Sequence, residues 1–185
     1  MIVPDLRYVS EYLTQAEHDR LLALVDRGPW LQTLSRRVQH HGYRYDYRAR
    51  RVDASVRVEP LPAWAAELAL RLHQDELADE LPDQLIVNEY LPGQGISRHV
   101  DSPACFGATV VSLSLGSPCV MELLPRDGGA PVPLLLEPRS ALVLAGPARY
   151  EWRHRIPARK ADRHEGRVLP RSRRVSLTFR KVLVR

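Results

Sequence analysis

Short apolar segments separated by proline- and glycine-containing turns fill the chain after Glu80, and this spacing limits the folds open to it. The segments are QLIVNEY, TVVSLSLGS, CVMELL, PVPLLLE, SALVLAG and RVSLTFRKVLV. Strand-length runs at such spacing are typical of an antiparallel sheet system, either a sandwich or a barrel. We therefore expect a jelly-roll-like β core over residues 84–183.

Two helices are predicted upstream of that core. The first follows Thr14 and Glu17, which form a capping-box pattern, and it carries an apolar stripe to about Arg27 before a Gly-Pro pair ends it. The second covers about residues 61–77, LPAWAAELALRLHQDEL. Its core-facing stripe comprises Trp64, Leu68, Leu72 and Leu77. The predicted fold class is α+β, mainly β, with N-terminal helices flanking a jelly roll.

Composition excludes several other classes of protein. The 185 residues suit one domain with a proper core, and 44% hydrophobic with 26% charged residues is a globular balance rather than a disordered one. No apolar run approaches the roughly 20 residues of a membrane span. The N-terminus MIVPDLRYVSEYL lacks the residue order of a secretory signal, and Cys105 and Cys119 show no CxxC spacing. We expect a cytoplasmic monomer with reduced thiols and no membrane contact.

Arginine carries almost all of the positive charge, because lysine occurs only at Lys160 and Lys181 while the formal net charge is +5. Residues 35–53 interleave arginines with tyrosines, and residues 157–174 are predicted to form a long basic loop between β segments. Such surfaces suit phosphates and stacked bases. The plainer alternatives are an arginine bias from genome composition, and a buried tyrosine cluster with a solvated arginine rim.

His99 and Asp101 form part of a candidate metal site. Residues i and i+2 of an extended segment point to the same face, so both side chains project together after the turn LPGQG. A histidine from a distant strand would complete a facial triad of two histidines and one carboxylate, and His154 is the best candidate. Such a triad leaves positions open, unlike a closed structural zinc site. Taken alone, an HVD tripeptide more often marks two solvated or hydrogen-bonded residues.

The last predicted strand carries a second polar cluster. Period-2 alternation places Arg174, Ser176, Thr178 and Arg180 on one face and apolar residues on the other. Two arginines facing a core need anions, and a small dicarboxylate is such an anion. Because the strand spans roughly 20 Å, one arginine suits the distal carboxylate of the ligand and the other its metal-bound end. The alternative is an outer, solvated face for both arginines.

Four motifs occur in order between Asn88 and Arg180, within a longer similar region from about Val38 to Val182: N-x-Y, H-x-D, a distant H, and R-x-x-x-x-x-R. They lie within NEYLPGQGISRHVD, RYEWRHRI and RRVSLTFRKV, with VVSLSLGS between the second and third. Together they resemble the AlkB family of iron(II)/2-oxoglutarate dioxygenases. The resemblance implies a double-stranded β-helix core and the use of Fe(II), 2-oxoglutarate and O2. The implied metal-binding and catalytic residues are His99, Asp101 and His154. The implied 2-oxoglutarate residues are Asn88, Tyr90 and Arg174, with Arg180 beside the co-substrate and the metal ligands.

The resemblance also covers residues 35–53, which match the family's nucleotide-recognition lid in position and texture. It implies that a single domain, residues 1–185, acts on nucleic acid, either single-stranded DNA or RNA, including tRNA. The implied substrate-binding residues are Tyr43, Tyr45, Tyr47, Arg48 and Trp152. Of these, Trp152 is equally consistent with plain core.

The expected activity is oxidative dealkylation of alkylated bases in DNA or RNA, a nucleic-acid repair function. Two departures from the family's repair enzymes leave the substrate open, because Pro103 replaces an acidic residue and Arg155 replaces a glycine. The sequence motifs are similar to those of the AlkB branch that hydroxylates a modified wobble uridine in tRNA, so hydroxylation without dealkylation is the main alternative. A protein or small-molecule hydroxylase and an inactive binding module are the others.

Overall fold

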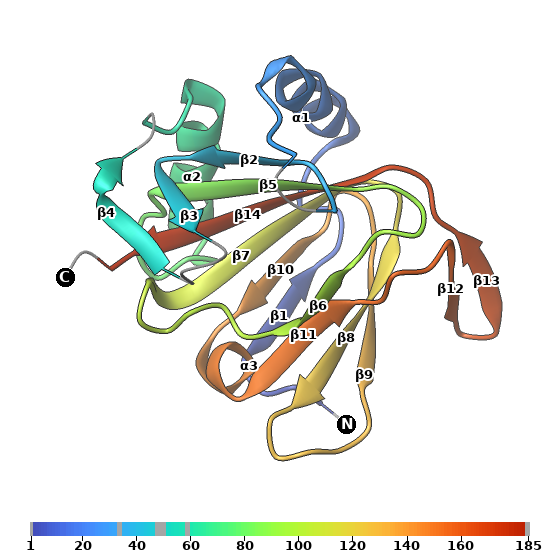
Figure 1. Cartoon of the computed structure of the whole chain (residues 1–185). Helices are drawn as coiled ribbons and strands as arrows, with labels where there is room; N and C mark the ends of the chain where they lie inside the picture. The colour runs from blue at the N-terminus through green and yellow to red at the C-terminus, as the bar shows by residue number, and fades with distance from the viewer. Residues whose placement is uncertain (1, 33–34, 47–50, 58–59, 184–185) are drawn as a thin grey trace.

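Two antiparallel sheets face each other across the centre of the molecule (Figure 1). The computed structural model describes residues 2–32, 35–46, 51–57 and 60–183. Within these ranges the larger sheet has six strands, in the order β1 (Leu6–Val9), β10 (Ala141–Leu144), β7 (Phe106–Gly116), β14 (Arg174–Val182), β5 (Gln84–Tyr90) and β2 (Val38–His41). The smaller sheet, over the same residues, has four: β6 (Ile96–His99), β11 (Trp152–Ile156), β8 (Cys119–Pro125) and β9 (Val132–Leu136). The predicted jelly-roll class is confirmed.

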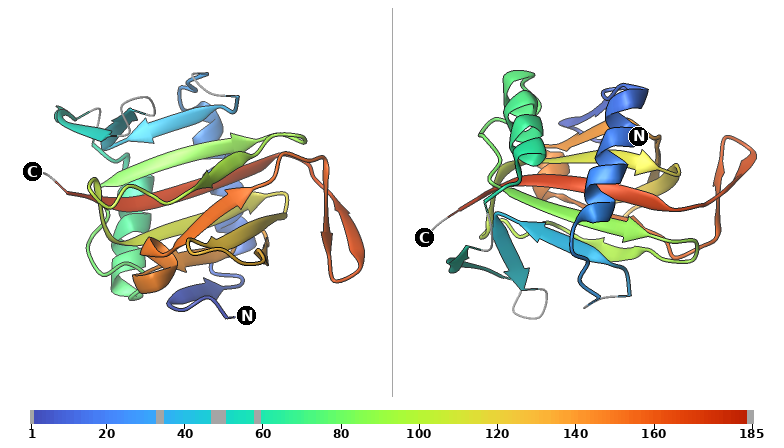
Figure 2. Two further views of the ribbon diagram at one scale, coloured as in Figure 1. Left: turned by 60° about the horizontal axis from the view of Figure 1, so that its bottom comes forward. Right: turned by 90° about the horizontal axis from the view of Figure 1, so that it is seen from above.

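Helices and small hairpins surround the two sheets. Helices α1 (Gln15–Arg27) and α2 (Ala63–Gln74) cover the outer face of the larger sheet, and α3 (Gly146–Tyr150) precedes β11 (Figure 2). The hairpins are β3–β4 (Tyr43–Asp46 with Arg51–Arg57) and β12–β13 (Ala161–His164 with Arg167–Pro170), and they project from opposite ends of the sheets. Among the described residues, no helix is long and apolar enough to cross a membrane.

Strand β14 shows why the larger sheet has two different faces. Val175, Leu177 and Phe179 are fully buried against the helices, in an apolar cluster that also draws on β5, β7 and β10. Burial of such side chains contributes about 1.5–3 kcal/mol each. The intervening residues point into the space between the sheets and line a cavity there: Arg174, Ser176, Thr178 and Arg180. The face of β14 opposite the helices thus holds a row of polar side chains inside the molecule, and the predicted alternation is confirmed.

The helix boundaries follow from local hydrogen bonding. The hydroxyl of Thr14 accepts the backbone N–H of Glu17 at 3.2 Å, and the Glu17 carboxylate accepts the Thr14 N–H at 2.8 Å. Helix α1 therefore begins at the predicted capping box. Helix α2 is shorter than the predicted 61–77, because Pro62 is its N-cap and Glu76 adopts a left-handed φ of 56° beyond its end.

Two N-terminal segments join the β core, which was not predicted. Strand β1 pairs with β10, and β2 pairs with β5, so both edges of the larger sheet come from outside residues 84–183. Each is only four residues long, which is too short for a period-2 pattern to stand out in the sequence. The second edge places the segment before β2 beside the polar cavity.

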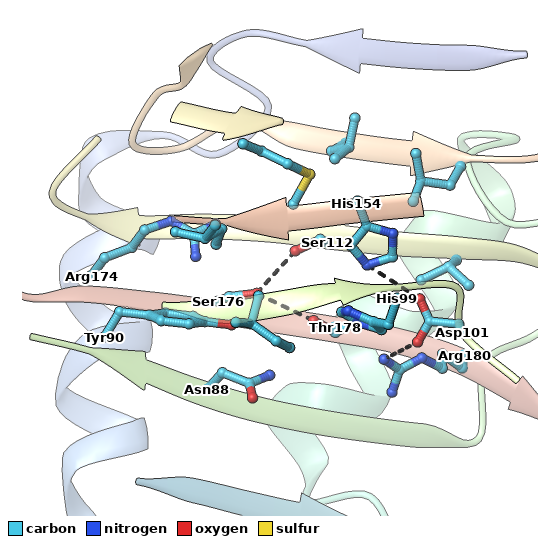
Figure 3. A pocket seen from close by; sticks show the side chains of 16 residues that line it. Asn88, Tyr90, His99, Asp101, Ser112, His154, Arg174, Ser176, Thr178 and Arg180 are labelled. Carbon is cyan, nitrogen blue, oxygen red and sulfur yellow. Dashed lines mark hydrogen bonds and ion pairs between the residues drawn. The ribbon is translucent and has the colours of Figure 1, made fainter. Parts of the chain in front are cut away.

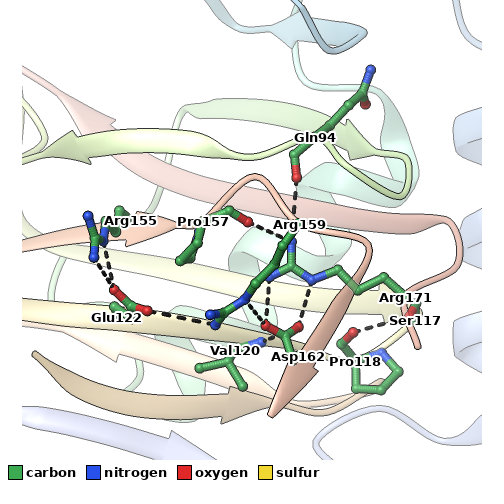
Figure 4. Close-up of polar contacts among 10 residues, drawn as sticks. All are labelled: Gln94, Ser117, Pro118, Val120, Glu122, Arg155, Pro157, Arg159, Asp162 and Arg171. Carbon is green, nitrogen blue, oxygen red and sulfur yellow. Dashed lines mark hydrogen bonds and ion pairs between the residues drawn. The ribbon is translucent and has the colours of Figure 1, made fainter. Parts of the chain in front are cut away.

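The prediction of a basic loop over residues 157–174 is wrong, because β12–β13 forms a hairpin there (Figure 1). The carboxylate of Asp162 is 1% exposed, and it accepts hydrogen bonds from Arg171 Nε at 2.6 Å and Arg159 Nε at 2.7 Å (Figure 4). It also accepts the Val120 N–H of β8 at 3.1 Å. One buried carboxylate therefore fixes the hairpin against the smaller sheet, and two of the arginines are paired with it rather than free.

Candidate active site

His99 and His154 lie directly opposite each other on the paired strands β6 and β11. Their ring centroids are 4.3 Å apart, and Asp101 lies beside them just after β6 (Figure 3). The Asp101 Oδ2 to His154 Nε2 distance is 3.6 Å, and the ligand atoms of all three residues fall within 4.8 Å of one another. Two neighbouring residues and one distant residue therefore converge on a single point between the sheets.

Close strand pairing and one hydrogen bond orient these side chains. A Cβ on Gly95, just before β6, would lie 2.2 Å from the carbonyl oxygen of Ile156, so only glycine permits this approach to β11. The His99 Nδ1 lies 2.8 Å from the Ser97 carbonyl oxygen. Because a carbonyl only accepts, Nδ1–H is the donor and Nε2 is left as the free ring nitrogen.

Two arginines hold Asp101. Arg180 forms an ion pair with its carboxylate, and Arg149 Nη1 donates to its backbone carbonyl at 2.6 Å. Burial opposes ionisation of Asp101, but the positive charges of Arg180 and Arg149 help to hold the pKa of this carboxyl well below its usual range. Burial, with the charge of His99, lowers the pKa of His154 to about 3. The site thus holds an anionic carboxylate beside a neutral imidazole, the protonation states that bind a divalent cation.

The donor set distinguishes between kinds of metal site. Two imidazoles and one carboxylate are the ligands of an iron(II) facial triad with open positions. A structural zinc site closes with four ligands. Within the described part of the chain, no fourth His, Cys, Asp or Glu joins the group of His99, Asp101 and His154. The residues therefore fit a catalytic iron(II) ion.

A cavity of about 60 Å³, here called the inner cavity, lies between the sheets and is lined by the triad and by polar residues of β5 and β14 (Figure 3). Arg174 at its wall is 3% exposed, and Arg174 Nη2 donates to Ser114 Oγ at 3.0 Å. The Nε and Nη1 atoms of the same guanidinium have no hydrogen-bond partner among the described residues. A buried, unpaired guanidinium is costly unless an anion meets it. The inner cavity therefore fits a small carboxylate ligand whose other end reaches the metal.

A second cavity of about 430 Å³, here called the outer cavity, adjoins the triad. It shares with the inner cavity the residues Asn88, Ile96, His99, Asp101 and Arg180. Its lining includes Tyr45 of β3 and Phe106 of β7, whose rings are 5.6 Å apart and inclined by 40°. Ligand pockets commonly span about 300–1,000 Å³. The metal ligands thus lie where a small polar chamber meets a larger one with aromatic residues in its wall.

Comparison with known proteins identifies the family to which the chain belongs. Residues 5–180 match the model of the 2OG-Fe(II) oxygenase superfamily. The chain is 38% identical over 97% of its length to the "Alkylated DNA repair protein ALKBH8 homolog" of Arabidopsis thaliana. It is 35% identical over 97% of its length to the Macaca fascicularis protein "tRNA (carboxymethyluridine(34)-5-O)-methyltransferase ALKBH8". The chain belongs to the AlkB family of 2OG-Fe(II) oxygenases.

The AlkB relatives are longer proteins, because the chain spans 59% of the Arabidopsis protein and 30% of the macaque protein. A solved structure, "The structure of OsALKBH1", shares the fold with a TM-score of 0.73 at 17% identity, and each chain is covered over 98% of its length. An AlkB-family member is a dioxygenase that uses iron(II), 2-oxoglutarate and O2. These groups, when bound, supply hydroxylation of a C–H bond with succinate and CO2 as co-products.

The chain's own residues have distinct tasks in this AlkB site. His99, Asp101 and His154 would hold the iron from one side. Arg174 would bind the far carboxylate of 2-oxoglutarate through its unpaired Nε and Nη1 atoms. Arg180 keeps Asp101 anionic. The outer cavity adjoins the same three ligands and takes no part in these tasks.

Only part of the predicted substrate set reaches the AlkB site. Tyr45 lines the outer cavity, whereas Tyr43 packs against a small apolar cluster at the ends of β7 and β14. Trp152 is 8% exposed within the apolar cluster between the sheets, and it is not among the described residues that line either cavity. Tyr47 and Arg48 lie outside the described residues, as does part of the predicted lid.

Ser114 and Arg149 had no assigned role in the prediction, and Arg36 was predicted only as one of several arginines in the lid of residues 35–53. The alternation in VVSLSLGS was a signal for Ser114, since it places that hydroxyl on the same face of β7 as Ser112. Arg36 and Arg149 carry no such signal. Their place depends on segments packing together that are distant in sequence, namely Arg36 against β5 and Arg149 against the loop after β6.

Proposed function

We propose that this protein oxidises an alkylated base in single-stranded DNA or RNA and releases the alkyl carbon as an aldehyde. The observation that carries the proposal is the outer cavity, which opens beside the metal ligands and has aromatic rings and arginines in its lining. A base extruded from its stack needs such a pocket, with a π-face to stack on and donors for its edge.

The residues of the outer cavity suit a base in three ways. Tyr45 and Phe106 offer aromatic faces. Arg36 and Arg98 bring positive charge to a ligand that carries phosphates. Asp101 and the two histidines of the triad place the metal at one end of the cavity, so an alkyl group that points inward from the base lies next to the metal. Hydroxylation of a carbon bonded to a base nitrogen gives a product that separates into the N–H base and an aldehyde.

A second candidate is hydroxylation of a modified uridine in tRNA. It is favoured by the name of the macaque relative, which concerns carboxymethyluridine at position 34, although that name describes a protein of which this chain spans 30%. The same site serves both candidates, because the outcome depends on the atom that bears the oxidised carbon. A hydroxylated carbon attached to a ring carbon stays on the base, whereas one attached to nitrogen leaves.

Nucleoside mass spectrometry distinguishes the two candidates. Methylated single-stranded DNA and bulk tRNA are each incubated with iron(II), 2-oxoglutarate and the protein. Loss of N-methyladenine or N-methylcytosine supports dealkylation, and one added oxygen on a tRNA uridine with DNA unchanged supports the second candidate. Succinate formation with both nucleic acids unchanged contradicts both, and it directs the search to protein or small-molecule substrates.

Two variants of one metal ligand control this experiment. Asp101→Ala removes the ligand and also leaves the buried guanidinium of Arg180 without its carboxylate. Asp101→Asn keeps an acceptor for Arg180 and removes only the anionic ligand. Both variants are expected to lose the nucleoside change, and the melting temperature of Asp101→Asn shows that the loss is not unfolding. Full activity in either variant would point to an oxidation that does not use this site.

A further inference from the structure

Arg36 is a buried cation without an acidic partner. The residue lies two positions before β2 and is 8% exposed, and it lines the outer cavity. Its Nε donates to Asn88 Oδ1 at 3.0 Å, and its guanidinium carbon lies 5.6 Å from the centre of the Tyr90 ring. Within the described residues, no carboxylate forms an ion pair with it, in contrast to Arg180, which pairs with Asp101. A guanidinium in this position, on the wall of the outer cavity, can bind an anion through its terminal nitrogens.

The backbone on both sides of Arg36 is anchored, so the side chain is held in place. The Ser35 carbonyl accepts a hydrogen bond from Gln94 Nε2 at 2.6 Å, and the Arg37 carbonyl accepts the Glu89 N–H at 3.0 Å. The Arg37 guanidinium also makes two bonds to the Glu89 carboxylate, at 2.6 and 2.7 Å. Neighbouring arginines therefore differ in role, because Arg37 is fixed by a carboxylate while Arg36 faces the cavity.

The charge of the outer cavity strengthens this contrast. Three arginines and one aspartate line it, which leaves a formal excess of two positive charges: Arg36, Arg98 and Arg180 against Asp101. Iron(II) and doubly charged 2-oxoglutarate bring equal and opposite charges, so the excess persists in the loaded enzyme. A cavity with such an excess attracts an anionic ligand group and repels a cationic one.

We propose that Arg36 binds an oxyanion of the target nucleotide in the outer cavity, and that it is a specificity-determining residue for substrates that carry this group. The oxyanion is either a phosphate that flanks the base or a carboxylate on the base itself, since a guanidinium forms the same paired N–H···O contacts with both. The inference rests on the proposed function, because it assumes that the outer cavity receives a nucleotide. It goes further because it states that the substrate presents a negative charge and that Arg36 binds it.

A double-mutant cycle between Arg36→Gln and the substrate tests the inference. Glutamine keeps a donor for Asn88 and removes the charge. Binding is measured by fluorescence anisotropy on protein loaded with Mn(II) and an inert 2-oxoglutarate analogue. One probe set is single-stranded DNA with a single N-methyladenine, in which each flanking phosphate is replaced in turn by a neutral methylphosphonate. The other is RNA with one carboxymethyluridine, compared with its methyl ester.

The charged probe is expected to bind Arg36→Gln about 10- to 100-fold more weakly than wild type, as for a lost hydrogen bond to a charged group. The neutralised probe is expected to bind both proteins equally. Coupling at one phosphate identifies the phosphate as the oxyanion, and coupling at the carboxylate identifies the base. Equal weakening of charged and neutral probes in both sets overturns the inference, because Arg36 then acts only by supporting Asn88.

A matched variant and a separate assay isolate the cause. Arg37→Gln removes the same charge from the adjacent residue, which faces Glu89 rather than the cavity, and it is expected to show no coupling with either probe set. Coupling as large in Arg37→Gln as in Arg36→Gln would overturn the inference in favour of general electrostatic attraction. Nucleoside mass spectrometry of wild type reports on the proposed function independently. If wild type oxidises a nucleoside but Arg36→Gln shows no coupling with either probe set, only the role of Arg36 is refuted. If wild type oxidises no nucleoside, the proposed function is refuted.

Discussion

Replacing Arg174 by methionine should make the protein more stable without co-substrate and should reduce the stabilisation that co-substrate gives. The Nε and Nη1 atoms of Arg174 are buried without partners, and an unpaired buried donor costs about 1–3 kcal/mol. The change also takes a donor from the buried hydroxyl of Ser114, which costs a similar amount once. The net expectation is a gain of about 1–3 kcal/mol in the free energy of unfolding. For a chain of this size each kcal/mol raises the melting temperature by about 2–4 °C.

Co-substrate should stabilise wild type more than the variant. Removing one partner of a buried guanidinium–carboxylate pair costs about 2–5 kcal/mol, so the dissociation constant for 2-oxoglutarate should rise about 30- to 4,000-fold in Arg174→Met. At a 2-oxoglutarate concentration of about 100 times the wild-type dissociation constant, wild type gains about 2.7 kcal/mol from binding. The variant gains little at the same concentration.

Thermal unfolding with Mn(II) in place of iron, with and without 2-oxoglutarate, measures both effects without turnover. Arg180→Met is the matched control on the same face of β14. It leaves the buried Asp101 carboxylate unpaired, so it should destabilise the metal-free protein by about 3–5 kcal/mol. If Arg174→Met melts below wild type without co-substrate, or keeps the full shift with it, the reasoning from the unpaired guanidinium is refuted.

Three further predictions concern the surroundings of the site. Gly95→Ala should push β6 away from the Ile156 carbonyl and weaken Co(II) binding in a spectroscopic titration, and unchanged binding would show that the strands can separate without moving His99. Arg149→Met removes a hydrogen bond to the Asp101 carbonyl and should weaken Co(II) binding about 10- to 100-fold, with wild-type affinity contradicting a positioning role. Burial, with nearby positive charges, lowers the pKa of His40 to about 4 from 6.5, so the folded protein binds fewer protons than the unfolded chain. Its unfolding free energy should therefore fall by at most about 3 kcal/mol between pH 6.5 and 4, and His40→Gln should flatten that part of the denaturant-measured pH profile.

The three metal-site residues differ in how far sequence alone could locate them. His99 and Asp101 are two residues apart, so extended geometry places them together whatever the rest of the fold does. His154 lies opposite His99 only because β6 and β11 pair in one register, and no local pattern specifies that register. The sequence alone made it the best candidate among the distant histidines, and the family resemblance supported that choice. The polar face of β14 was predictable for the opposite reason, since seven residues of strict alternation specify it.

Contacts between distant segments explain what the sequence did not show. The run over residues 157–174 was predicted as a loop because so basic a stretch does not fit a core, yet the buried carboxylate of Asp162 binds two of its arginines and fixes a hairpin. Arg36 belongs to a segment that contains many arginines, and its hydrogen bond to Asn88 of β5 distinguishes it from its neighbours. Residue type was informative at both positions, but the burial that gives each its role depends on packing.

The wall shared by the two cavities restricts how an enzyme of this kind can change its substrate in evolution. Any substitution at a shared residue alters the inner and the outer cavity at once, so loss of 2-oxoglutarate turnover would remove most such variants. Some residues line the outer cavity alone, such as Tyr45, Arg98 and Ser102, and substitutions there leave the lining of the inner cavity unchanged. New specificities should therefore arise at those positions while the reaction chemistry stays constant, and a directed-evolution library confined to them should retain far more active members than one drawn from the shared wall.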